Sequence, residues 1–156
     1  MVFRLPRYID LLNNILMETS DLRRHRIIKN LTAQPTENSV HASIVLWEQM
    51  STQLISIVGV GGFNSLFARS VFLAQSAFPW LAIDILSPPT DQRFAELKMR
   101  LEGRPPAEAG AANSLLLITF TDILAALIGE QLTISILCSA WGDKASDRRD
   151  KEFDND

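Results

Sequence analysis

The sequence predicts an all-α protein, a single-domain helical bundle of about six helices built on two helix-glycine-helix units. Apolar residues recur at helical spacing along most of the chain, and proline or glycine residues separate the periodic segments. A chain of 156 residues can bury one substantial core but is short for two ordinary domains. We therefore expect one domain over residues 1–142, followed by a disordered charged tail over residues 143–156.

Two helices are expected in the N-terminal segment. The first covers residues 6–18, because apolar side chains recur at helical spacing after Pro6, which a first turn tolerates. Ser20 is a suitable N-cap for the second helix, which combines an apolar stripe with basic residues. Residues 34–38 contain Pro35 and polar side chains, and they predict a loop.

From Ser39 onward, apolar and polar residues divide into two faces of an amphipathic helix. That helix is expected to end in a tight turn at Gly59, Gly61 and Gly62, because glycine allows positive φ angles. A helix that is apolar nearly all round follows over residues 63–78 and is expected to be central.

The segment between the two predicted units is shorter and more polar. Pro79 interrupts the preceding helix, and the pattern leaves the structure of residues 80–86 undetermined. Thr90 or Asp91 is expected to cap a surface helix that ends at Gly103.

The longest apolar run, residues 114–141, predicts the centre of the core. Its first half carries a wide apolar stripe at helical spacing, and Gly129 offers a stop or a bend. The stripe consists of Leu116, Phe120, Ile123, Leu124, Leu127 and Ile128. Residues 132–137 fit a helix but also alternate with the period of a strand, and we favour the helix. Beyond Trp141 the residues are mostly charged, which predicts a tail without a buried face.

The two units resemble each other when Gly59 is aligned with Gly129 without gaps. Five pairs then combine similar residues: Leu46 with Leu116, Leu54 with Leu124, Val58 with Ile128, Ser65 with Ser135, and Leu66 with Ile136. Apolar helices match one another easily, so this pattern does not establish a duplication.

Composition favours a cytosolic protein. The net charge of -3 disfavours a nucleic-acid binder, and the single cysteine, Cys138, excludes an internal disulfide and is expected to be a buried, inert thiol. The N-terminus shows no secretion signal, and Asp122 and Glu130 disfavour a membrane span over residues 114–141 because charges are costly there. The hydrophobic fraction of 47% leaves apolar residues for an oligomer interface.

Two groups of residues are candidate anion contacts. Gly59, Gly61 and Gly62 precede a helix, as in phosphate-binding turns, but the motif lacks a third glycine at its usual spacing and a preceding strand, so a helix cap is favoured. The basic residues Arg23, Arg24, Arg26 and Lys29 form a patch that could contact nucleic acid or anionic lipid, but a solvated helix face is favoured because the net charge is negative and no nucleic-acid motif accompanies them.

Three charged residues interrupt helices that are expected to be central: Arg69, Asp122 and Glu130. A buried charge without a partner is costly, so we expect Arg69 to pair with Asp122 or Glu130. The alternative is a polar spot in an apolar pocket that holds a small ligand.

No catalytic motif or metal-ligand spacing is found, and no cofactor is implied. We therefore expect a non-enzymatic cytosolic protein that works by protein association, as a homodimer or other homo-oligomer. A helical small-ligand sensor or carrier with a pocket near Arg69 is the first alternative. Peripheral nucleic-acid or membrane binding through the basic N-terminal helix is the second.

Overall fold

The computed structural model describes residues 22–32, 39–83 and 90–154, and it describes side chains in 22–32, 39–83 and 94–142. Within these ranges the protein is all-helical and contains no strand, which confirms the predicted fold class. The elements are a helix over residues 22–32, α2 (Ser39–Ala74), the 3₁₀ helix η1 (Pro79–Leu81), α3 (Thr90–Glu102), α4 (Pro106–Ile128) and α5 (Glu130–Asp154). The helix expected over residues 6–18 and the loop over residues 34–38 lie outside the described residues.

Two glycines break the long helices in nearly the same way. Gly59 interrupts α2 with φ 80° and ψ 167°, and Gly129 separates α4 from α5 with φ 96° and ψ 155°. Gly129 ends the hydrogen bonding of α4 and begins that of α5, because its N–H donates to the Ala125 carbonyl at 2.9 Å and its carbonyl accepts from the Thr133 N–H at 3.1 Å. Each glycine therefore changes the direction of the chain within a single residue.

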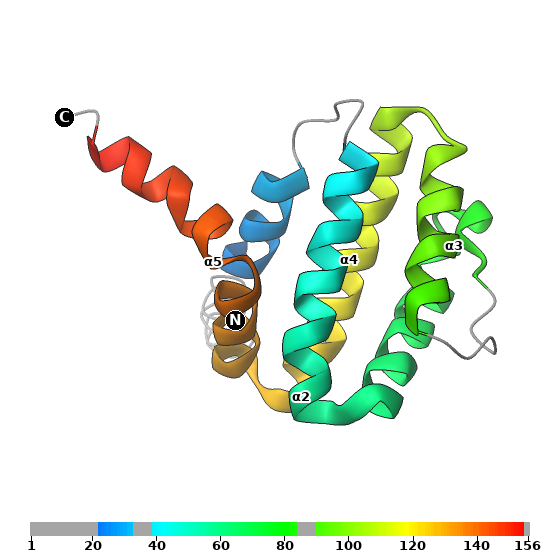
Figure 1. The fold of residues 1–156 in the computed structure, drawn as a ribbon, viewed down its shortest axis with the longest axis horizontal. Coiled ribbons are helices and arrows are strands. Elements are labelled where there is room, and N and C mark those ends of the chain that lie inside the picture. Colours follow the sequence, from blue (N-terminus) through cyan, green and yellow to red (C-terminus); the bar gives the residue numbers. More distant parts are fainter. Residues whose placement is uncertain (1–21, 33–38, 84–89, 155–156) are drawn as a thin grey trace, which may run out of the picture.

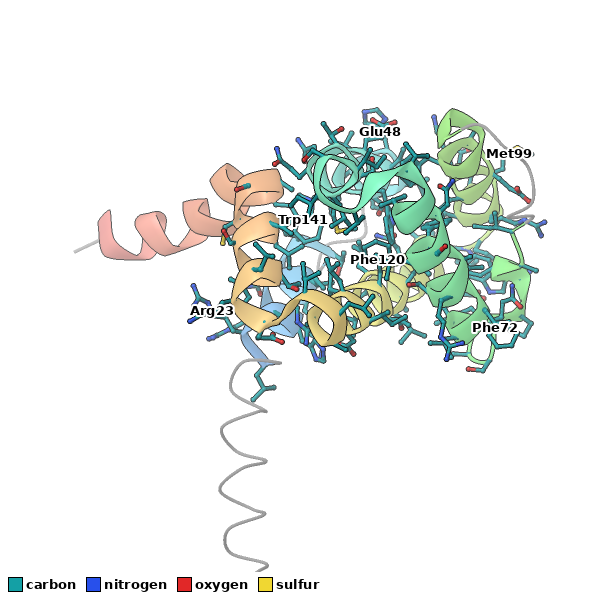
Figure 2. The ribbon with its side chains drawn as sticks, turned by 90° about the horizontal axis from the view of Figure 1, so that it is seen from below. Arg23, Glu48, Phe72, Met99, Phe120 and Trp141 are labelled. Atoms are coloured by element: carbon teal, nitrogen blue, oxygen red, sulfur yellow. The ribbon has the colours of Figure 1, made fainter. Side chains whose placement is uncertain are left out.

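The first half of α2 and helix α4 run in the same direction, and both glycine breaks lie at the same end of the bundle (Figure 1). Beyond the breaks, the second half of α2 and helix α5 turn to opposite sides of this central pair, as Figure 2 shows from below. Trp47 joins the pair, because its ring packs edge-to-face on Phe120 and on Phe67, each at a centroid distance of 5.3 Å. Its Nε1–H donates to Asn113 Oδ1 at 2.8 Å.

The two units also bury the same positions. In all five pairs of the gapless alignment, both residues have the same degree of burial: three pairs are buried, Val58 and Ile128 are half-buried, and Ser65 and Ser135 are exposed. Leu54 and Leu124 are both fully buried, at 0% exposure. The aligned positions of the two units therefore have equivalent places in the structure, but this equivalence does not establish a duplication.

The short segment after α2 is anchored to α4. The Trp80 Nε1–H donates to Glu108 Oε1 at 2.9 Å, and the Arg104 guanidinium lies over the Trp80 ring at 5.0 Å. Such a cation–π contact and an indole hydrogen bond are usual for a half-buried tryptophan. This contact holds the η1 segment beside the start of α4.

The structure differs from the expected elements at two places and agrees with them at a third. Gly61 and Gly62 are helical, so the expected three-glycine turn is a break at Gly59 alone. Residues 132–137 belong to α5, as favoured over a strand. Residues 143–154 continue α5 where we expected a disordered tail, and this part points away from the bundle (Figure 1). Lysine, arginine and glutamate have high helix propensity, which is consistent with a helical backbone there.

Candidate functional site

The charged residues of the expected core gather around Arg24. The Arg24 side chain is only 2% exposed, and its Nε–H donates to Glu130 Oε1 at 2.9 Å while Nη2 donates to Glu130 Oε2 at 3.4 Å. Nη1 forms an ion pair with Asp122 and also contacts Thr121 Oγ1 at 3.4 Å. One guanidinium therefore connects the helix over residues 22–32 with both α4 and α5.

His25 extends this cluster toward solvent. Its Nε2 lies 2.8 Å from Asp122 Oδ1, and the His25 side chain is 28% exposed. Burial is the largest influence on the pKa of Arg24 and acts to lower it, but the hydrogen bonds and charges of Glu130 and Asp122 outweigh burial and raise this pKa above its ordinary value. Arg24 therefore remains charged at any physiological pH.

The prediction that Arg69 pairs with Asp122 or Glu130 was wrong. Asp122 and Glu130 pair with Arg24, whereas Arg69 is exposed on the second half of α2 beside Phe72, which is 67% exposed. Arg69 needs no buried carboxylate because its guanidinium is in water. The sequence pattern failed because the second half of α2, apolar almost all round, has one face that the bundle does not cover.

Arg24 is buried and is therefore not part of the expected basic patch. It shares a buried face with Ile28, four residues later, whereas Arg23, Arg26 and Lys29 are exposed. The helical period places the second of the three clustered arginines inward. The surviving patch therefore consists of three basic residues on the outer face of this helix.

The three glycines of the candidate anion-binding turn do not form a loop; a helical segment begins directly after Gly59. Gly59 alone has a positive φ, and the helical segment after it begins with Val60, Gly61 and Gly62. None of these residues brings a charged side chain, and a helix start by itself does not define a binding site. The glycines serve to turn the chain.

The same turns form an apolar surface that the sequence did not indicate. Eight large hydrophobic residues are exposed among the described side chains, and four of them lie within three positions of Gly59 or Gly129. These four, which we call the glycine-turn end, are Ile57 (52% exposed), Val60 (50%), Leu127 (68%) and Leu132 (44%). The other four of these eight residues are Leu22, Phe72, Leu73 and Met99. Half of the exposed large apolar residues thus gather at one end of the bundle.

Leu127 and Cys138 correct two expectations. Leu127 continues the apolar stripe of α4 in sequence, but the helix has passed the core at that level and the side chain faces solvent. Cys138 was expected to be buried, and it is exposed because α5 turns Thr133, Leu137 and Trp141 inward instead. The sequence around Gly59 lacks charged residues, and this feature could have indicated the apolar end.

Among the described residues, no three histidine, cysteine, aspartate or glutamate side chains gather at a distance suited to a metal ion. Helices Ser39–Ala74 and Pro106–Ile128 are long and apolar enough to cross a membrane, but this is weak evidence, because the core helix of a soluble protein passes the same test.

Comparison with known proteins found no matching family model, no matching curated protein and no matching solved structure.

Proposed function

We propose that this chain is a non-enzymatic cytosolic protein that works by association with a second copy of itself, and that the glycine-turn end is the contact surface. The concentration of exposed apolar residues at that end carries the proposal. Soluble monomers rarely leave large apolar side chains exposed together, and such groups usually mark interaction sites. Ile57 and Leu127 occupy equivalent positions in the two units, so this end offers similar groups on both of its sides.

Charge favours a copy of the same chain as the partner. In a twofold interface the same surface of both copies is in contact. A surface with one sign of charge would therefore repel its own copy, whereas an uncharged surface would not. Around Gly59 the exposed residues from 56 to 61 are uncharged. The charged residues closest to Gly129 in the sequence, Glu130 and Asp122, are both paired with Arg24, so their charges are largely offset.

The proposal is tested by sedimentation equilibrium across the micromolar range. We expect the wild type to be a dimer and the double variant Ile57→Ser with Leu127→Ser to dissociate at least about tenfold more readily, which corresponds to about 1.4 kcal/mol. Met99→Ser is the matched control, because Met99 is 72% exposed but lies on α3. Its dimer should be as tight as that of the wild type.

Three results would count against the proposal. A monomeric wild type removes self-association, and equal weakening by Met99→Ser places the interface elsewhere. Flotation of the wild type with vesicles containing anionic lipid, lost on replacing Arg23, Arg26 and Lys29 by glutamine, would instead establish membrane binding through the exposed basic residues.

A further inference from the structure

The two glycine breaks have the same backbone geometry but different side chains around them. The gapless alignment of the two units pairs Asp122 with Thr52 and Glu130 with Val60. Thr52 donates its hydroxyl to the Glu48 carbonyl within its own helix at 2.9 Å, and Val60 has no polar group. Charged residues therefore stand on both sides of Gly129, and neutral residues occupy the equivalent positions around Gly59.

Arg24 connects the two sides of the Gly129 break. Asp122 is on α4, before the glycine, and Glu130 is the first residue of α5, after it. The bidentate contact with Glu130 and the ion pair with Asp122 use different nitrogens of one guanidinium, which is planar and therefore fixes the relative positions of both carboxylates. Without the arginine, the two carboxylates would repel each other across a residue that has no Cβ to restrict its backbone.

We propose that Arg24 is a positioning residue that clamps the Gly129 break and sets the angle between α4 and α5. Leu127 and Leu132 stand on opposite sides of that break, so the clamp also sets the shape of this half of the glycine-turn end. The helix over residues 22–32 thereby controls self-association from a distance. This last step rests on the proposed function, whereas the clamp itself does not.

The clamp is tested by a distance measurement between α4 and α5. Spin labels are placed on the native Cys138 of α5 and on Ala111→Cys of α4, both exposed positions remote from the cluster. The labelled chains are diluted in an excess of unlabelled protein, so that only distances within one chain are measured. We then expect one narrow distance distribution in the labelled parent protein and a broader or shifted one after Arg24→Gln. Arg26→Gln is the matched control, because Arg26 is an exposed arginine of the same helix, and it should leave the distribution unchanged.

Further variants separate positioning from general loss of structure. Glu130→Gln weakens only the contact between Arg24 and α5, and it should also broaden the distribution. It replaces Arg24→Gln if that variant is too unstable to measure. Arg24→Lys keeps the charge but lacks the planar fork, so it should recover the distribution only partly. Circular dichroism at 222 nm verifies that each variant is folded. An unchanged distribution in a folded Arg24→Gln or Glu130→Gln variant overturns the clamp.

The link to association is measured on unlabelled protein. Arg24→Gln should weaken the dimer at least about tenfold in sedimentation equilibrium, while Arg26→Gln should not. A broadened distance distribution with an unchanged dimer constant overturns the control of association by Arg24. A monomeric wild type with a broadened distribution in Arg24→Gln refutes the proposed function and supports the clamp, so the two failures are distinguishable.

Discussion

Replacing the two hinge glycines by alanine tests whether the breaks are required by the fold. Gly59 and Gly129 have φ values of 80° and 96° with ψ near 160°, a region that is almost restricted to glycine. An alanine Cβ at either position would meet no heavy atom within 4 Å, so the cost is backbone strain alone. Such strain is on the order of 1–3 kcal/mol for each substitution.

Helical glycines of the same chain provide the control. Gly61 and Gly110 are helical and equally free of neighbours within 4 Å, so alanine there should stabilise the protein by about 0.5–1 kcal/mol. The difference between the hinge and control substitutions is therefore about 1.5–4 kcal/mol, the sum of the two effects. Denaturant unfolding followed by circular dichroism at 222 nm resolves a difference of this size.

The units should respond alike. Because the two breaks share their geometry and their lack of steric contacts, Gly59→Ala and Gly129→Ala should lose similar free energies of unfolding. If Gly59→Ala were as stable as Gly61→Ala, the positive φ would not be a constraint of the fold. Our account of the helix-glycine-helix unit would then be wrong.

Two further predictions concern the tail and the ion pair. Deleting residues 144–156 should leave the melting temperature nearly unchanged, because so charged a segment has little to bury, and a fall of many degrees would show that it docks. The pKa of Arg24 is raised, so its contribution to stability is complete below the pKa of the unfolded state and is lost only as the pH rises through the higher pKa of the folded state. The difference in unfolding free energy between the wild type and Arg24→Gln should therefore be equal at pH 8 and pH 10, and a smaller difference at pH 10 would contradict it.

The sequence alone determined the fold class and the location of the core. Helical periodicity is a local property of the chain, and it indicated helices on both sides of Gly59 and Gly129 because each helix buries a face that repeats every 3.6 residues. The pattern also indicated that Asp122 and Glu130 need a cationic partner, since charges within an apolar helix are costly when unpaired.

Only the tertiary structure decided which cation that is and which apolar residues remain exposed. Arg24 is separated from Asp122 by 98 positions and from Glu130 by 106, and no local pattern connects them. Arg69 was the more attractive partner from sequence because its neighbours are apolar, but Phe72 beside it is exposed as well. Whether an apolar face is buried depends on the packing of other helices against it, which is a property of the assembled bundle and not of the segment.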